Sequence, residues 1–375
     1  MILPALTLSA VSCVNVSFEP LVNDNIAAVT SAFDWGTIDE HPDTMTIIST
    51  RTERELHYAF GYKYNPEPEK DKADTVSFVR GDYYSVAFGC RPDAFVLPDL
   101  KSFIVDRSYP LKNIYVSPNR IGDDNTEEEK LQEIIWDRMG FPEDLKRKVK
   151  KGTSLWEDLS PRNKVYEAEE SFFWAVCRSY ADPAETLTIP FEPKELTVNL
   201  EFTIPVRVSG DVEILGAFAA LTGVPSYVSL MSGELEAKDL GKIYFPLSEE
   251  SGVYSGSART FGLFSPNSPT FIGGPGILCI YFILRMDTDE GELVRVSSPA
   301  MKNLWTVLGS ANGTMANRIL SKVEYSEKYI LKTNRFTMNI PSVTVSWNGG
   351  EDVQFKWEDG GETEGDDWSD VVWGN

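Results

Sequence analysis

The residues best suited to catalysis are few in this chain. Its only two histidines, His41 and His57, lie in the polar segments DEHPD and ELHYAF. A Ser-His-Asp or Cys-His site needs a histidine that a third group orients, and neither segment resembles the surroundings of a catalytic nucleophile or base. Because the chain has 57 Asp and Glu residues, carboxylate pairs are abundant and none stands out as a glycosidase-like pair. We therefore predict a protein that is not an enzyme.

Motifs for binding metals and phosphates are incomplete. Asp287, Asp289 and Glu290 precede Gly291 as in part of a calcium loop, but the full EF-hand order is missing, so a hairpin turn is the simpler interpretation. The glycine runs GGPG and NGG do not precede a helix with a lysine, as a phosphate-binding loop would require. We predict that the protein holds no metal and no cofactor.

The four cysteines stand too far apart in the sequence for a zinc ribbon, a redox CxxC pair or a haem motif. Cys90 and Cys279 lie in apolar alternating runs, where a small buried thiol is the expected structure. We interpret Cys177, in SFFWAVCRSY, in the same way. These three cysteines are thus predicted to be structural.

The N-terminal segment permits two interpretations. MILPALTLSAVSC is apolar and uncharged, and the small residues Ala10 and Ser12 precede Cys13. This pattern is typical of the end of a bacterial lipoprotein signal peptide, in which the cysteine becomes lipidated. No Lys or Arg precedes the apolar run, and a start codon assigned too far downstream would explain that. The alternative is a first β-strand, within TLSAVSCVNVSFEP, that enters the first domain.

The overall charge argues against nucleic acid as a partner. The formal net charge is −22, from 57 acidic and 35 basic residues, and such a balance repels a phosphate backbone. The one basic run, KRKVKK at residues 146–151, is therefore interpreted as a solvated or internally paired surface. No stretch reaches the roughly 20 apolar residues that a membrane-spanning helix needs.

Residues 196–234 are the segment around which the predicted β-structure is organised. Apolar and polar residues alternate from Leu196 to Ile204, as in a strand with one face on a core. Residues 211–220 are apolar almost throughout, and a turn at Gly223 and Pro225 should separate them from a strand at 227–231. The simplest interpretation is the hairpin core of an all-β domain.

Strands are also expected on both sides of this segment. Residues 75–78 and 83–88 should form a β-hairpin, with Gly81 and Asp82 in the turn. The segment SGVYSGSAR, at residues 251–259, is interpreted as a connection because it is rich in Gly and Ser. The other expected strands are 26–35, 44–49, 166–179, 187–190, 242–246, 260–264, 277–286, 292–297, 328–339, 342–347 and 353–357.

A helical insertion is predicted at about residues 123–151. Acidic residues open its first helix, as a helix N-terminus prefers, and Gly140-Phe141-Pro142 ends it. Pro142 then begins a second short basic helix, EDLKRKVKKG.

The chain length favours two domains, because 375 residues exceed what one hydrophobic core usually serves. Glu192-Pro193-Lys194 is the expected joint. The acidic, glycine-rich end should be a flexible tail, in which Trp368 and Trp373 either anchor a partner or a sugar or fold back on the protein. The predicted parts are a leader or lipidated segment at 1–25, an N-terminal β-sandwich at 26–191, a C-terminal β-sandwich at 192–357 and the tail at 358–375.

Several of these segments together resemble the fimbrillin-like surface proteins of the Bacteroidales, in particular the anchor or accessory fimbrial subunits that are made as lipoproteins. In the first domain the similar motifs are FDWGTIDEHPDTM and GDYYSVAF. In the second domain they are LTGVPSYVSLMSGE, TFGLF, ILCIYFILRMDTDEG and VSWNGGEDVQFKW. Their order and spacing agree over most of residues 27–357.

The resemblance implies an all-β fold of two tandem transthyretin-like β-sandwich domains, with a short helical insertion in the first. It also implies a signal peptide, a lipid such as palmitate on Cys13, and a place at the cell outer membrane. The expected function is that of a non-catalytic fimbrial subunit in cell adhesion, anchoring or accessory, whose partners are other fimbrial subunits joined by β-strand addition. The alternative is a surface lipoprotein that binds a glycan or a host protein through its sandwich loops.

This chain differs from the family pattern at two places besides the leader. Residues 126–151 have no counterpart in it, and the segment SSPAMKNLWTVLGS fits it poorly. Polymerising members insert a strand into a neighbour after a proteolytic cut at an Arg or Lys, and no residue here is assigned to that cut. The type of subunit therefore stays open.

Overall fold

The computed structural model describes residues 25–38, 41–42, 44–51, 59–64, 75–90, 95–96, 114–122, 126–152, 165–167, 170–233, 235–264, 276–304, 307, 320–322, 328–331, 335–349 and 353–360. Within these ranges the chain is built mainly from strands and has two helices longer than one turn. The predicted all-β class with a short helical insertion is confirmed.

Two sheets are built mainly from the N-terminal part of the chain. One has three strands in the order β4–β1–β9, and the other has five in the order β10–β8–β5–β2–β3. Their strands are β1 (Ile26–Phe33), β2 (Met45–Arg51), β3 (Ala59–Tyr64), β4 (Val76–Val79), β5 (Gly81–Gly89), β8 (Phe173–Ala181), β9 (Leu187–Phe191) and β10 (Lys194–Glu195).

These two sheets enclose a common hydrophobic core. Ala27 and Val29, two residues apart on β1, are fully buried, as expected when one face of a strand packs on a core. They join Ile47 of β2, Phe78 of β4 and Phe191 of β9 in one cluster. Sheets that share a buried face in this way form a β-sandwich.

The predicted hairpin between residues 75–78 and 83–88 is wrong in its pairing, although both strands exist. β4 pairs with β1, whereas β5 pairs with β2 and β8, so the chain passes from one sheet to the other at Arg80. The side chains of Phe78 and Tyr83 then meet in the core, with ring centroids 4.4 Å apart. Burial of the apolar faces of both strands thus favours a change of sheet over a hairpin.

A network of twelve hydrogen-bonded strands forms most of the C-terminal part. Its main order is β17–β16–β12–β13–β14–β11–β22–β23, and β18, β21, β7 and β6 attach to it. A separate small sheet has the order β15–β20–β19. The bounds are β6 (Phe95–Val96), β7 (Tyr115–Pro118), β11 (Val198–Gly210), β12 (Val212–Ser229), β13 (Leu235–Glu250), β14 (Val253–Thr260), β15 (Leu263–Phe264), β16 (Ile277–Thr288), β17 (Gly291–Val296), β18 (Ala300–Asn303), β19 (Leu320–Lys322), β20 (Lys328–Leu331), β21 (Arg335–Asn339), β22 (Val343–Trp347) and β23 (Gln354–Trp357).

Strand β12 runs unbroken through the turn predicted at Gly223 and Pro225. Its register against β13 shifts between Thr222 and Val224 and again between Pro225 and Tyr227. β-bulges accommodate the extra residues, and Gly223, at φ 76°, adopts a conformation that glycine tolerates best. β12 pairs with β13 and β16 and not with β11, so the predicted hairpin of residues 196–234 is also wrong.

The Gly/Ser-rich segment predicted as a connection is strand β14. It pairs with β11 on one side and with β13 on the other. At Gly256 a Cβ atom would lie 2.6 Å from the carbonyl oxygen of Pro246, so the close approach of the neighbouring backbone requires glycine there. Glycine therefore marks tight strand packing at this position and not a loop.

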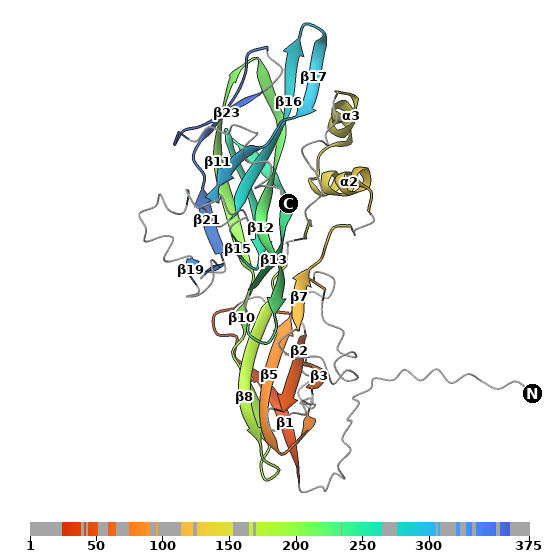
Figure 1. Ribbon diagram of the computed structural model, residues 1–375, viewed down its shortest axis with the longest axis vertical. Coiled ribbons are helices and arrows are strands. Elements are labelled where there is room, and N and C mark those ends of the chain that lie inside the picture. Colours follow the sequence, from red (N-terminus) through yellow and green to blue (C-terminus); the bar gives the residue numbers. More distant parts are fainter. Residues whose placement is uncertain are drawn as a thin grey trace, which may run out of the picture.

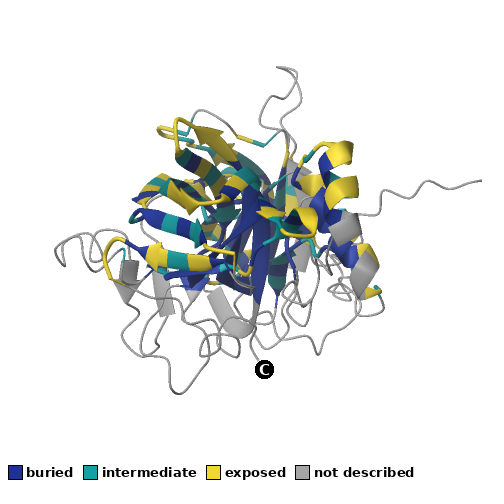
Figure 2. Cartoon of the chain, turned by 90° about the horizontal axis from the view of Figure 1, so that it is seen from above, coloured by how far each residue is buried: buried dark blue, intermediate teal, exposed yellow. Residues whose placement is uncertain are grey.

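Two helices, α2 (Glu128–Arg138) and α3 (Glu143–Gly152), confirm the predicted insertion. Gly140, at φ 69°, ends the first one, as expected. By sequence the insertion belongs to the first predicted domain, yet it packs on the C-terminal network. Ile135 of α2 lies in one cluster with Phe218 of β12, and Val149 of α3 lies in another with Ile283 of β16. Figure 2 shows both helices with a buried side toward the sheets and an exposed outer side.

The N-terminal and C-terminal sheets are joined by paired strands and by side-chain hydrogen bonds. Val116 of β7 pairs with Val228 of β12, which carries the N-terminal chain into the C-terminal network. The Trp174 indole donates a hydrogen bond of 2.7 Å to the carbonyl of Leu230, and the Tyr84 hydroxyl donates one of 2.6 Å to the carbonyl of Met231. Figure 1 shows the resulting elongated molecule, and the predicted domain boundaries stay predictions.

Candidate functional site

The residues singled out from the sequence do not converge on a reaction centre in the part of the chain that the structure describes. The ring of His41 stacks on Trp35, with centroids 4.9 Å apart. His57, Cys13, Trp368 and Trp373 lie outside the described residues. Lipidation of Cys13 therefore stays a prediction.

The acidic segment that resembles part of a calcium loop is a hairpin turn, as predicted. It joins β16 to β17, whose residues Thr288 and Gly291 face each other in the antiparallel register. The Thr288 hydroxyl donates a hydrogen bond of 2.8 Å to the Gly291 carbonyl. Across the described ranges, no three His, Cys, Asp or Glu side chains come together as metal ligands.

The three cysteines in the described ranges are free thiols with different degrees of burial. Cys279 is fully buried, as predicted, whereas Cys90 and Cys177 are only half-buried. Burial raises the pKa of Cys279 to about 12, against a smaller opposing effect of Lys242. Burial and then the nearby charge of Glu170 raise the pKa of Cys90 to about 12. Both thiols are thus held in the protonated, unreactive form at neutral pH.

The raised thiol pKa values predict a loss of stability in base. Below pH 9.0, the ordinary value of such a thiol, Cys279 is protonated in the folded and unfolded states alike. Between 9.0 and about 12 the unfolded thiol ionises while the folded one keeps its proton, so the free energy of unfolding should fall as the pH rises through this range. Urea denaturation at a series of pH values measures it. A Cys279→Ala variant should show a shallower fall, and an equal fall in both proteins would contradict the assignment.

Two residues of the basic run on α3, Lys146 and Lys148, pair with acidic residues of the same chain, which is one of the two alternatives predicted for this run. The ammonium group of Lys146 lies 2.5 Å from the carboxylate of Asp137, and this hydrogen bond is the main reason that the pKa of Lys146 is raised. Lys148 lies 3.8 Å from the carboxylate of Glu292 on β17. The helix thus presents basic residues to acidic ones of the same chain, while Val149 is buried beneath it.

A cleft of about 520 Å³ lies between α2 and the C-terminal network, and it is the candidate functional site. Residues of α2, β11, β13 and β14 line it, together with the segment at residues 166–167. Its volume is in the range of small-molecule sites. Figure 1 shows α2 on the right-hand side of the C-terminal strands.

The strand register brings polar side chains to one face of the cleft. Asn199 on β11 lies opposite Arg259 on β14, and Ser255 on β14 lies opposite Ser248 on β13. The spacing along β14 is two residues from Ser255 to Ser257 and again to Arg259. These three side chains therefore point to the same side of the sheet. All five residues line the cleft.

Two arginines that line the cleft are held in position by carboxylate and hydroxyl groups. Arg138, at the end of α2, makes an ion pair with Glu167. Arg259 donates a hydrogen bond to the Ser171 hydroxyl, and its guanidinium lies 3.7 Å from the carboxylate of Glu195. Ion pairs of this kind hold each guanidinium in a defined orientation.

The sequence analysis missed this cleft because it treated the polar part of β14 as a loop. The alternation of Ser255, Ser257 and Arg259 was the signal that could have indicated a strand with one polar face. Arg138 and Glu167 come from segments outside the sheet, and no local pattern predicts that they meet. The described residues that line the cleft supply hydrogen-bond donors and acceptors and two guanidinium groups, which can bind a polar ligand.

Comparison with known proteins gives structural matches only. No family model matches the chain, and no curated protein matches it. A candidate adhesin from Bacteroides ovatus matches with a TM-score of 0.48 and 10% identity over 76% of this chain and 85% of that one. A second candidate adhesin from Bacteroides ovatus has a TM-score of 0.46 and 14% identity over 89% and 93%. The fimbrial anchor protein Mfa2 from Porphyromonas gingivalis has a TM-score of 0.41 and 10% identity over 89% and 97%.

Among the described residues, no helix has the length and apolar character to cross a bilayer.

Proposed function

We propose that this protein is a non-catalytic subunit of a cell-surface fimbrium, in an anchoring or accessory position. The observation that carries the proposal is the order of family-like motifs along residues 27–357, most of which include strands of the structure, such as GDYYSVAF in β5 and ILCIYFILRMDTDEG in β16. The names of the compared structures are consistent with it.

Assembly with other fimbrial subunits by β-strand addition is the second element of the proposal. β17 and β23 stand at the two ends of the main order of the C-terminal network. Terminal strands present backbone N–H and C=O groups that can pair with a strand from another chain. A pull-down with the full chain should recover fimbrial subunits, and recovery of none of them would contradict this element.

Lipidation of Cys13 and attachment to the cell outer membrane form the third element. We expect the wild-type protein, expressed in a bacterium that exports and lipidates lipoproteins, to require detergent for extraction. A Cys13→Ala variant should appear outside the membrane fraction, because the thiol that would carry the lipid is absent. A Cys90→Ala variant, which removes another thiol, is the matched control and should stay in the membrane fraction. Release of wild-type protein into buffer without detergent would count against the anchor.

The alternative function is a surface protein that binds a host protein or a glycan through its sandwich loops. A pull-down with the full chain separates the two, because a surface protein that acts alone should recover no fimbrial subunit, whereas sugar binding would fit either function. Fractionation does not separate them, since both proteins would be lipidated.

A further inference from the structure

We propose that the cleft between α2 and the C-terminal network binds a small saccharide that carries one carboxylate, such as a hexuronate or a sialic acid. This inference goes beyond the proposed function, because it applies equally to a fimbrial subunit and to a free surface protein. It concerns the helix-covered face of the sheet and not the sandwich loops.

The cleft offers donors for a carboxylate on two of its elements. Arg138 comes from α2 and Arg259 from β14, and both side chains are partly exposed, at 41% and 27%. Their contacts with Glu167, Ser171 and Glu195 each use one terminal nitrogen of the guanidinium group. Since a guanidinium has five N–H donors, N–H groups remain that these contacts do not use. A carboxylate is the partner that such groups bind best in a planar, two-point arrangement.

The charges around the cleft disfavour a doubly charged ligand. Arg138 and Arg259 are the two basic residues among the described residues that line it, and each lies beside one carboxylate, that of Glu167 and that of Glu195 respectively. These charges balance, in a chain of net charge −22 that repels anions in general. The cleft therefore favours a monoanion, bound by the guanidinium N–H groups that remain, over a doubly charged phosphate.

The remaining lining suits the hydroxyl groups of a sugar ring. Ser255, Ser257 and Asn199 supply hydroxyl and amide groups that both donate and accept hydrogen bonds. Tyr166 and Tyr244 also line the cleft, but they are only 4% and 8% exposed, so they are fixed parts of its wall and offer little surface for stacking. A volume of about 520 Å³ accommodates one or two sugar rings.

The test is calorimetric titration of the full chain with glucuronate, N-acetylneuraminate, galactose and inorganic phosphate. At least one of the two carboxylate sugars should bind, and the one that binds identifies whether a hexuronate or a sialic acid fits the cleft. Galactose and phosphate should bind at least about tenfold more weakly, because each lacks either the carboxylate or the ring hydroxyls. Galactose or phosphate binding as tightly as the carboxylate sugars, or no binding of any probe, would overturn the proposal.

Two variants connect the binding to the cleft. Arg138→Gln and Arg259→Gln should each weaken the binding about tenfold, because a charge-assisted hydrogen bond is lost. Arg285→Gln is the matched control, since Arg285 is also 41% exposed and also pairs with a carboxylate, that of Glu213, but does not line the cleft. Equal binding by the wild type and Arg138→Gln, which changes an exposed side chain and should fold, would refute the site even if Arg259→Gln does not fold. The titration uses no membrane and no other subunit, so its failure would leave the fimbrial proposal untouched.

Discussion

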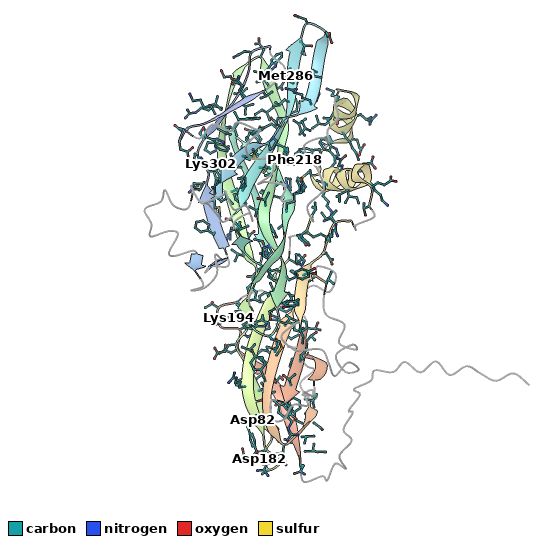
Figure 3. All side chains as sticks on the ribbon, viewed as in Figure 1. Asp82, Asp182, Lys194, Phe218, Met286 and Lys302 are labelled. Carbon is teal, nitrogen blue, oxygen red and sulfur yellow. The ribbon has the colours of Figure 1, made fainter. Side chains whose placement is uncertain are left out.

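A Phe218→Ala variant is expected to lower the free energy of unfolding by about 3–5 kcal/mol, the usual cost of removing a fully buried aromatic side chain. Phe218 on β12 is 1% exposed, and its ring stacks on Tyr281 of β16 at a centroid distance of 4.9 Å. On its other side lies Phe141, in the turn between the helices, at 6.1 Å. Figure 3 labels Phe218 on the face of the network toward the helices.

Because of the position of Phe218, the substitution should loosen the packing of α2 as well as lower the overall stability. It belongs to the same cluster as Ile135 and Met139, so the cavity would lie under α2, which forms one wall of the cleft. We therefore expect the substitution to increase the rate of amide hydrogen exchange more in α2 than in β1 and β2. Those two strands pack in another cluster.

Urea denaturation measures the loss of stability, and hydrogen exchange locates it. Val208→Ala is the control, because Val208 is 48% exposed on β11 and its truncation should change the free energy of unfolding by less than about 0.5 kcal/mol. A loss below about 1 kcal/mol for Phe218→Ala would contradict its role as the residue that docks the helices.

The second large effect is expected at the ion pair between Lys302 and Asp359. The side chain of Lys302, on β18, is only 6% exposed, and its ammonium lies 2.6 and 2.5 Å from the two carboxylate oxygens of Asp359. The same ammonium lies 5.1 Å from the centroid of the Trp357 ring, so it has one anionic and one aromatic partner. Figure 3 labels Lys302 in the C-terminal half of the molecule.

Removing only the acidic partner should be the more damaging change. Asp359→Ala leaves a nearly buried ammonium without its carboxylate, and we expect a loss of about 2–4 kcal/mol, reduced from the cost at a fully buried pair because Asp359 is 42% exposed. Lys302→Met removes the charge and keeps the apolar stem, so its cost should be about 1 kcal/mol. The double variant should be no less stable than Asp359→Ala alone.

A double-mutant cycle by urea denaturation measures this coupling. Glu358→Ala is the matched control one residue away, because Glu358 pairs with Arg207 at 3.6 Å while both side chains are more than 60% exposed. Its expected effect is within about 0.5 kcal/mol. Strictly additive effects of Lys302→Met and Asp359→Ala would show that burial of the ammonium does not determine the cost.

Hydropathy in the sequence identified most strands and both helices but not which strands pair. The period-two alternation after Leu196 and the apolar run that begins at Ile277 correspond to β11 and β16. Pairing depends on residues far apart in the chain: β11 lies between β14 and, in parallel, β21 and β22. No local pattern specifies such partners, because each strand exposes the same backbone groups on both of its edges.

Glycine and proline misled the sequence analysis at two places for the same physical reason. In β12 they accompany bulges within one long strand, and in β14 Gly256 permits close approach of the neighbouring backbone. Glycine widens the range of backbone conformations and proline narrows it, but neither requires a turn, so only the neighbouring strands decide whether the chain continues or reverses.

The sequence by itself determined the β-class, the helical insertion and the structural role of Cys279, because each depends on composition or periodicity within one segment. Only the tertiary structure decided that the insertion packs on the C-terminal network and that Arg138 and Arg259 line one cleft. The side chains of this cleft come from segments more than 100 residues apart, whose meeting depends on the burial of Phe218 and its neighbours beneath α2. Long-range packing of that kind leaves no periodic trace in any one of the segments that it joins.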